Sequence, residues 1–248
     1  MLDTDVTDVL DDGEVKRVLA VMAHPDDIDF SAAGSVAVWT DQGIEVSYLM
    51  VTDGDAGGFD PAVPRSDIPG IRQAEQRAAA KAVGVEDVRF LGYPDGMVEA
   101  TLGLRRDIAR VIRQVRPDRV VLPSPELNYD RMYAGHPDHR AVGSAALDAV
   151  YPDSRNPFTF PELLADEGLE AWTVREVWIP GTKPEANHHV DITKVFDRKV
   201  AALRSHVSQV EHHTDLEGML RGWMSANAQS RGLPEGVLAE IFRVINTA

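Results

Sequence analysis

Short apolar segments of strand length alternate with longer segments of helical character through most of this chain. The strand-like segments are rich in aliphatic residues and span positions 18–22, 46–51, 87–91, 119–122 and 174–179. Segments expected to be helical lie between or after them, at 31–42, 71–83, 104–115 and 195–207. Strands separated by helices of this length predict βαβ crossovers, and therefore an α/β protein with a mostly parallel central sheet.

Turn-forming residues mark the limits of several elements. Ser31 is suited to cap the first helix, and Gly43 and Gly84 are suited to end the first two. Residues 54–69 form a loop rich in glycine and proline. An amphipathic pattern at 234–245 predicts a last helix.

We expect a single domain at 15–248, preceded by a flexible acidic tail at 1–14. Within the domain, a proline-containing stretch without clear periodicity predicts an irregular insertion at about 151–172. A loop of this length in a compact domain usually serves function, so we expect it to be a pocket wall or a lid.

Two clusters of histidine and aspartate each follow a predicted strand. Residues 23–27 (Ala-His-Pro-Asp-Asp) come directly after the strand at 18–22, and residues 136–139 (His-Pro-Asp-His) come after the strand at 119–122. In open parallel sheets, ligands bind at the carboxyl ends of the strands. The two clusters are therefore expected to meet at that edge of the sheet.

Composition narrows the class of partner. Hydrophobic residues make up 44% of the chain, which is enough for a core, and 25 basic against 40 acidic residues give a net charge of −15. Such an acidic chain is a poor binder of nucleic acid or of anionic membranes. There is no cysteine, so any metal must be held by nitrogen and oxygen ligands.

The first residues are acidic rather than basic, and no apolar run approaches membrane-spanning length. We therefore expect a cytoplasmic protein without membrane insertion.

His24, Asp27 and His139 have the residue types of a catalytic zinc site. Two imidazoles and one carboxylate can hold zinc and leave one position open for water. Amide hydrolysis requires a water that loses a proton, a polarised carbonyl and a leaving amine that gains a proton. A metal would serve the first two needs, so a metal-dependent hydrolase is the leading hypothesis.

Three neighbouring residues are candidates for the remaining roles. Asp26, next to Asp27, could face the substrate and take the proton of the water. His136 lies one helical turn before His139 and could protonate the amine or stabilise the oxyanion. Asp138 could orient an imidazole through a hydrogen bond.

Each cluster has a simpler explanation when taken alone. His-Pro-Asp-Asp is often only a capped turn, and His-x-x-His is often two surface histidines. Their occurrence together, at one edge of one sheet, favours a metal site. Structural zinc sites normally use four protein ligands, so three ligands favour an open catalytic position over a non-catalytic zinc-binding protein.

The chain resembles the LmbE-like family of zinc-dependent N-deacetylases. This family includes the N-acetylglucosaminyl-phosphatidylinositol de-N-acetylases and the deacetylase and amidase of mycothiol metabolism. The resemblance rests on the two histidine motifs together, and matching segments extend over nearly the whole chain beyond its tail. The supporting segments are 52–54 (Thr-Asp-Gly), 72–75 (Arg-Gln-Ala-Glu), 91–96 (Leu-Gly-Tyr-Pro-Asp-Gly) and 190–192 (Val-Asp-Ile), followed by Lys199, Ala202, Leu203 and His206.

The resemblance implies a Rossmann-like three-layer sandwich in which His24, Asp27 and His139 hold zinc. It implies that Asp26 is the general base, and that His136 is the general acid or the group that stabilises the oxyanion, with Asp138 behind it. The implied activity is removal of an acyl group, expected to be acetyl, from an N-acylated amino sugar or related small amide. Zn²⁺ is the expected cofactor, with Fe²⁺ as the alternative.

The chain departs from some relatives at two positions. Where those relatives have a tyrosine two residues before the first histidine of the second motif, this chain has Ala134, and Tyr133 stands one residue earlier. A role for Tyr133 at the oxyanion is therefore not assigned. Ile28 replaces an acidic residue, which we expect to affect packing more than chemistry.

Arg72, Asp95 and Gly57 are candidates for contact with the substrate. Arg72 could reach a hydroxyl or phosphate group, although an ion pair with Glu75 is the stronger expectation. Asp95 could accept hydrogen bonds from sugar hydroxyls. Gly57, like its neighbour Gly58, would allow a ligand to approach the backbone closely.

The remaining histidines leave other hypotheses open. The pairs at 188–189 and 212–213 could form a second metal site, but adjacent histidines usually face different ways. His206 is expected to be a packed helix residue.

Three other functions are alternatives to that of a small-molecule deacetylase. An amidase of a larger thiol conjugate would share the metal chemistry. A nucleotide-binding dehydrogenase would need a Gly-x-Gly-x-x-Gly motif after the first strand, where this chain has His-Pro-Asp-Asp. A non-catalytic zinc-binding protein is the third. The sequence does not decide whether the chain forms homo-oligomers.

Overall fold

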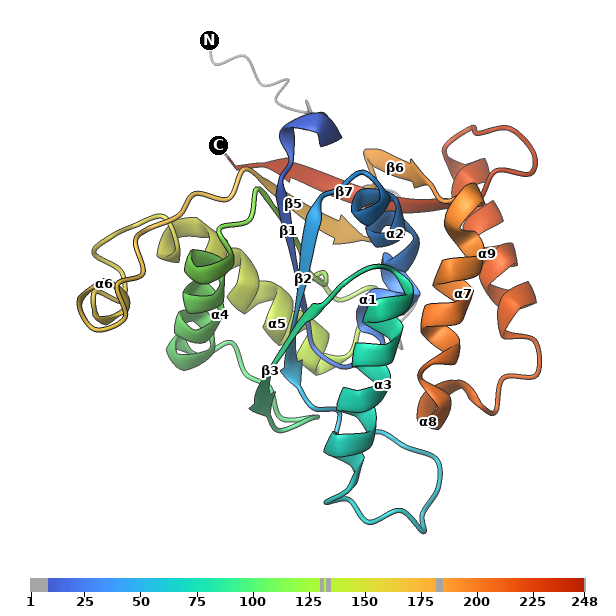
Figure 1. Ribbon diagram of the computed structural model, residues 1–248, viewed down its shortest axis with the longest axis horizontal. Helices are drawn as coiled ribbons and strands as arrows, with labels where there is room; N and C mark the ends of the chain where they lie inside the picture. Colours follow the sequence, from blue (N-terminus) through green and yellow to red (C-terminus); the bar gives the residue numbers. More distant parts are fainter. Residues whose placement is uncertain (1–8, 130–131, 133–134, 182–184, 248) are drawn as a thin grey trace.

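The computed structural model describes residues 9–129, 132, 135–181 and 185–247. Within these residues, seven strands form one sheet in the order β3-β2-β1-β4-β5-β7-β6 (Figure 1). The strands are β1 (Arg17–Met22), β2 (Glu45–Thr52), β3 (Asp87–Tyr93), β4 (Arg119–Val121), β5 (Glu176–Pro180), β6 (His188–Asp191) and β7 (Ala239–Asn246). Strands β1 to β5 are parallel, and β7 runs antiparallel to both β5 and β6.

Helices cover both faces of this sheet. The α-helices are α1 (Asp27–Ser31), α2 (Ala33–Asp41), α3 (Ile68–Ala82), α4 (Leu102–Val115), α5 (Pro137–Asp148), α6 (Glu162–Ala165), α7 (Phe196–Arg204), α8 (Val207–Val210) and α9 (Leu216–Ser230). Short helical turns are η1 (Asp12–Glu14), η3 (Ala149–Asp153) and η4 (Thr193–Val195). Helices α4 and α5 lie on one side of the sheet, and α2, α3, α7 and α9 lie on the other (Figure 1).

The central strand β1 explains why the sequence forms three layers. Its alternate residues point to opposite faces: Val18, Ala20 and Met22 join the core beneath α2, α3, α7 and α9, while Leu19 and Val21 join the core beneath α4 and α5. All five are buried. A strand buried on both faces has a continuous apolar run, which is the pattern expected for a parallel sheet. The predicted α/β three-layer fold is confirmed.

The prediction of a helix at 234–245 is wrong, because this segment forms the strand β7. Most residues of β7 are buried, including the carboxylate of Glu240. The strand therefore lacks the alternation of buried and exposed residues that marks a strand with one face in solvent. Glu240 is tolerated there because Lys199 Nζ donates to its Oε1 over 2.7 Å.

The first helix also begins differently from its predicted cap. The chain turns into α1 at Asp27, breaks at Ala32 (φ −146°) and continues as α2. The hydroxyl of Ser31 does not cap a helix; it donates to the carbonyl of Asp27 over 2.7 Å. The long helix α9, which begins after the capping residue Asp215, was not predicted.

The predicted insertion at about 151–172 follows the end of α5 that is opposite to His136. It starts at the C-terminal end of α5 and leads to Glu176, which pairs with Arg119 at the start of β4. The buried guanidinium of Arg113 on α4 donates to the backbone carbonyls of Asp153, Ser154, Asn156 and Thr159. These bonds hold the start of the stretch against α4, and its expected role as a pocket wall or a lid stays a prediction.

The expected acidic tail is only partly described. Residues 1–8 lie outside the described residues, whereas Val9 and Leu10 pack against the core. The carboxylate of Asp12 accepts a hydrogen bond from the buried Arg119 over 3.0 Å. This part of the segment belongs to the folded domain. Among the residues the structure describes, no helix combines the length and the apolar character needed to cross a membrane.

The strand order places a topological switch point between β1 and β4. From β1 the chain moves outward to β2 and β3 and then returns to β4 on the other side of β1. Crossovers leave in opposite directions there, which opens a crevice at the carboxyl ends of these two strands. Residues 23–27 follow β1, and residues 135–139 enter α5 after β4.

Candidate active site

The end of β1 turns sharply into α1 and presents the side chains of His24 and Asp27. The carboxylate of Asp27 accepts a hydrogen bond from the backbone N–H of His24 over 2.8 Å, which folds the turn back on itself. The end of β1 is tied to β2, because the backbone N–H and the hydroxyl of Thr52 both donate to the carbonyl of Ala23 over 2.9 Å. His24 is therefore held on a buried, hydrogen-bonded strand end.

Helix α5 brings the second cluster to the same place. His136 is its N-cap residue, with Pro137 in the first turn, a position at which proline loses no helical hydrogen bond. A Cβ atom on Gly143 would lie 2.3 Å from the carbonyl oxygen of Pro123, so α5 packs directly on the chain leaving β4. This close packing fixes where the first turn of α5 meets β1.

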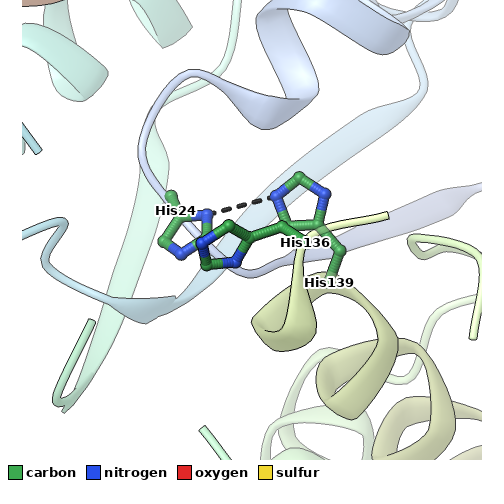
Figure 2. Close-up of side chains that lie close together, drawn as sticks. All are labelled: His24, His136 and His139. Carbon is green, nitrogen blue, oxygen red and sulfur yellow. Dashed lines mark hydrogen bonds between the residues drawn. The ribbon is translucent and has the colours of Figure 1, made fainter. Parts of the chain in front are cut away.

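The side chains of His24, Asp27 and His139 converge on one point. His24 Nδ1 lies 3.2 Å from His139 Nε2, as Figure 2 shows. Asp27 Oδ1 lies 3.0 Å from His139 Nε2, and Asp27 Oδ2 lies 3.5 Å from His24 Nδ1. The ring of His136 lies 4.9 Å from that of His24, and ring nitrogens of His24, His136 and His139 lie within 4.8 Å of one another (Figure 2).

The contacts of His24 Nε2 determine whether its Nδ1 has a free lone pair. Nε2 lies 3.1 Å from Asp95 Oδ1 and 3.2 Å from Asp138 Oδ2. Carboxylates accept hydrogen bonds, so the N–H is at Nε2 and the lone pair of the neutral ring is at Nδ1. This carboxylate–histidine arrangement is the one that orients histidine ligands of metal ions. The donor set thus fits a divalent cation bound at His24 Nδ1, Asp27 and His139 Nε2.

The electrostatics of the cluster favour positive charge. Burial opposes a charge on His24, but the hydrogen bonds that its ring donates to Asp27 and Asp95 outweigh it and raise the pKa of His24 to about 11. Burial likewise opposes ionisation of Asp27, but His139 and His24 hold the pKa of that carboxyl well below its usual range. Asp27 in turn raises the pKa of His139 against the effect of burial. Carboxylates that attract a proton this strongly also attract a metal cation.

Asp138 connects α5 to the loop after β3. Its fully buried carboxylate accepts hydrogen bonds from the backbone N–H groups of Gly96 over 2.7 Å and Val98 over 3.2 Å. It therefore holds His24, as expected for an orienting partner, and also closes the loop that carries Asp95.

Asp26 lies beside the ligands but does not join them. Its carboxylate Oδ2 accepts a hydrogen bond from Arg72 Nη2 over 3.0 Å. Burial raises the pKa of Asp26 to about 7, an effect that the positive charge of Arg72 reduces and the negative charge of Asp27 adds to. A carboxylate with a pKa near neutrality is suited to take up and release protons.

His136 is a neutral imidazole in this arrangement. Burial and the neighbouring positive charge of His24 lower its pKa. Its Nδ1 accepts a hydrogen bond from the backbone N–H of Asp138 over 3.2 Å, so the proton of the neutral ring is on Nε2. His136 can therefore donate a hydrogen bond at the edge of the site.

Arg72 is an internal residue, and the expected ion pair with Glu75 is wrong. The guanidinium, on a side chain that is 3% exposed, donates to the carbonyls of Pro25 and Gly54 as well as to Asp26. Glu75 accepts hydrogen bonds instead from the backbone N–H and hydroxyl of Ser208, each over 2.7 Å.

Gly57 and Asp95, the other two candidates for substrate contact, also contact residues of the site itself. A Cβ atom on Gly57 would lie 2.3 Å from Nη1 of Arg72, so the close approach that this glycine permits is that of the arginine. Both carboxylate oxygens of Asp95 have partners, one at His24 and the other at the backbone N–H of Ala56.

The paired histidines at 188–189 and 212–213 are not part of this cluster. Within the described part of the chain, the groups of three or more ligating side chains that could hold a metal ion all contain His24. His188 packs edge-on against Trp178, and His212 packs against Phe59. Tyr133 and Ala134 lie outside the described residues.

Sequence reasoning missed one buried group next to the site. Gln76, Asp29 and His206 are fully buried and hydrogen-bonded to one another behind Asp26. A signal was present, because Gln76 lies one turn after Arg72 and one before Ala80 on the buried side of α3. A polar residue in that apolar row has to find a buried partner.

The fold and the site together define a hydrolytic α/β enzyme with a His/Asp centre suited to a metal ion, which acts on amide bonds. Comparison with known proteins agrees. The family model described as GlcNAc-PI de-N-acetylase (PIG-L) matches residues 19–150. The chain belongs to this family.

Individual relatives are similar over most of their length. A diacetylchitobiose deacetylase from Thermococcus kodakarensis is 36% identical over 197 residues, which cover 79% of this chain and 71% of the relative. A protein named probable N-acetyl-alpha-D-glucosaminyl L-malate deacetylase 2, from Bacillus cereus, is 34% identical over 201 residues, covering 79% and 84%. The solved structure of N,N'-diacetylchitobiose deacetylase from Pyrococcus horikoshii superimposes with a TM-score of 0.84 at 30% identity, covering 94% of this chain and 85% of that one.

Proposed function

We propose that this protein is a divalent-metal-dependent N-deacetylase that acts on an N-acetylated amino sugar. The observation that carries the proposal is the convergence of His24 Nδ1, His139 Nε2 and the carboxylate of Asp27 within 3.0–3.5 Å of one another, with the separate carboxylate of Asp26 alongside. The three relatives described above all have names that refer to deacetylation of an N-acetylated glucosamine unit.

His24, Asp27 and His139 would hold the metal ion, with Zn²⁺ as the expected ion and Fe²⁺ as the alternative. Such an ion supplies a Lewis acid for the amide carbonyl and lowers the pKa of water. Asp138 and Asp95 keep the Nδ1 lone pair of His24 directed at the ligand position, because both accept from its Nε2–H.

Asp26 is the proposed general base. Its carboxylate takes a proton from the water whose oxygen attacks the amide carbonyl carbon. When the carbon–nitrogen bond breaks, that proton passes to the leaving nitrogen, and the products are acetate and the free amine of the sugar. Arg72 holds Asp26 in place and keeps part of its population ionised at neutral pH.

His136 is the proposed donor to the developing oxyanion. The substrate's carbonyl oxygen gains negative charge as the water attacks, and the Nε2–H of neutral His136 can stabilise it by a hydrogen bond. The lowered pKa of His136 favours this role over that of a general acid.

Arg72, Asp95 and Gly57 are proposed to support the catalytic groups rather than to contact the sugar. The hydrogen bonds of Arg72 and both oxygens of Asp95 are directed at groups of the site itself. We therefore infer that contacts to the sugar come from other residues around the crevice.

The proposed function is tested by assaying the release of free amine. The purified protein is treated with a chelator, reloaded with Zn²⁺ or Fe²⁺, and incubated with N-acetylglucosamine, N,N'-diacetylchitobiose, N-acetylglucosaminyl malate and a larger amide conjugate. Metal-dependent amine release from the acetylated sugars is expected. Preference for the larger conjugate would identify an amidase, and full activity without metal, or no activity on any substrate, would overturn the proposal.

A further inference from the structure

Asp26 has a backbone conformation that its side chain disfavours. Its φ is +93° and its ψ is −24°, in the left-handed region, although it is not a glycine. For an L-residue this conformation is disfavoured, and it persists only when surrounding contacts hold it. No side-chain capping bond from Asp26 itself offsets this cost.

A chain of buried hydrogen bonds ends at the backbone of this residue. The N–H of Asp26 donates to Gln76 Oε1 over 2.8 Å. Gln76 Nε2 donates to Asp29 Oδ2 over 2.8 Å, and His206 Nε2 lies 2.9 Å from the same oxygen. The amide of Gln76 must present its oxygen to an N–H and its nitrogen to a carboxylate, so only one orientation of this amide satisfies both contacts.

All three side chains in this chain of bonds are inaccessible to solvent. Gln76, Asp29 and His206 each have a relative exposure of 0%. In such an environment a broken hydrogen bond is not replaced by water, and the group left unpaired destabilises the folded protein. The position of each group therefore depends strongly on that of the next.

The chain of bonds joins three helical elements behind Asp26. Gln76 comes from α3, Asp29 from α1, and His206 from the start of α8. Lys199 on α7 fixes α1 further, because its Nζ donates to the backbone carbonyls of Asp29 over 2.9 Å and Phe30 over 2.8 Å. The backbone of the turn that carries Asp26 is thus held by α3, α7 and the start of α8, while Arg72 holds the carboxylate of Asp26.

We propose that Gln76, Asp29 and His206 are positioning residues that hold Asp26 in its left-handed conformation, so that its carboxylate faces the reacting water. The inference rests on the proposed function, in which Asp26 is the general base. None of the three lies within the converging donor set of His24, Asp27 and His139. Their loss should therefore lower kcat without removing the metal or weakening substrate binding.

The test compares variants that keep or remove one hydrogen bond of this relay. Gln76→Met has a similar side-chain volume and loses both bonds, and His206→Leu loses the donor to Asp29. His206→Gln is the conservative partner, because its amide nitrogen can still donate to Asp29. We expect kcat to fall about tenfold to hundredfold in Gln76→Met and His206→Leu, and to remain within about threefold of wild type in His206→Gln.

Metal content, KM and thermal midpoint are measured on the same samples. KM and metal content should stay at wild-type values. Glu176→Gln is the stability control, because it weakens an equally buried ion pair with Arg119 at the amino ends of β4 and β5. It should lower the thermal midpoint and leave kcat unchanged.

A crystal structure of Gln76→Met gives a readout that needs no substrate, with φ of residue 26 expected to leave the left-handed region. Wild-type kcat and an unchanged φ in Gln76→Met would overturn the relay while leaving the deacetylase intact. So would a loss of kcat that is matched by a loss of metal. Absence of turnover in the metal-loaded wild type would instead overturn the proposed function.

Discussion

At the scale of single residues, the two adjacent aspartates after β1 have different partners because of one backbone rotation. Asp27 begins α1 and points at His24 and His139, whereas Asp26, with φ of +93°, points at Arg72. The sequence motif alone indicates two acids. In the proposed function, the left-handed turn separates the metal ligand Asp27 from the general base Asp26.

Replacing Asp26 by Asn tests this separation. Asparagine tolerates left-handed backbone conformations, so Asp26→Asn changes the charge and leaves the turn intact. We expect kcat to fall about 10²- to 10⁴-fold with the metal content unchanged, since general base catalysis is typically worth that much. Activity and metal stoichiometry are measured together. Loss of the metal would mean that the roles of Asp26 and Asp27 are reversed.

Gly57 is the residue at which a single methyl group should disturb the base from a distance. A Cβ atom there would lie 2.3 Å from Arg72 Nη1 and would displace the guanidinium that holds Asp26. We expect Gly57→Ala to lower kcat roughly tenfold. Gly70→Ala is the control: a Cβ atom at Gly70 in α3 has no neighbour within 4 Å, so kcat should not change. Equal kcat values for the two variants would contradict the role given to Arg72.

At the scale of elements, most of the parallel part of the sheet could be predicted from the sequence. The runs after which His24 and His136 appear are buried on both faces, and such strands have a signal that does not depend on their partners. β7 could not be predicted in this way. Its buried Glu240 is stabilised by Lys199, which is 41 residues away in sequence, and no local pattern shows such a partner.

The same reasoning applies within the site. The convergence of His24, Asp27 and His139 could be predicted because metal ligation demands particular residue types at particular spacings. The partners of Arg72 and the relay through Gln76 could not, because they depend on how α3 packs against the turn before α1. Spacing within α3 suggested Glu75 as the partner of Arg72, and the tertiary contacts with Asp26 replaced it.

The contact between α1 and the start of α8 makes stability depend on pH. Burial opposes a charge on His206, but the hydrogen bond and negative charge of Asp29 outweigh it and raise its pKa above the ordinary 6.5. A group whose pKa is raised by folding contributes its full stabilisation below its unfolded pKa and loses it as the pH rises through the folded value. The ion pair should therefore stabilise the protein fully below about pH 6.5 and progressively less above it.

Urea unfolding of the wild type and of His206→Gln between pH 6 and pH 9 measures this contribution. The difference in unfolding free energy between the two proteins should shrink as the pH rises. A difference that stayed constant or grew with pH would show that His206 is not protonated in the folded protein.

At the scale of the whole molecule, the two helical layers are joined to the sheet by different chemistry. The layer of α4 and α5 packs through aliphatic side chains, whereas the layer of α2 and α7 also contains the fully buried ion pair of Lys199 and Glu240. Glu240 additionally accepts hydrogen bonds from the backbone N–H groups of Gly34 and Ser35 at the start of α2. One charged pair thus fastens α1, α2 and α7 to β7.

Breaking this pair from one side should be costly. Lys199→Met leaves the carboxylate of Glu240 buried without its cation, and we expect a loss of about 3–5 kcal/mol in unfolding free energy. Arg204→Met, on the same helix, removes an exposed pair with Glu217 and should cost less than about 1 kcal/mol. Denaturant titration of both variants makes the comparison, and similar losses would contradict the importance given to burial.

The position of β7 between β5 and β6 has a consequence for how the protein is made. β6 pairs with β7 and not with β5, so it has no place in the sheet until β7 has been synthesised and inserted. During translation, the part of the chain up to β5 can assemble the crevice, but β6 stays unpaired until β7 is available. A ribosome-bound chain that stops before Ala239 should therefore lack β7 and also leave β6 unpaired, and it should expose the flank of β5 to other nascent chains.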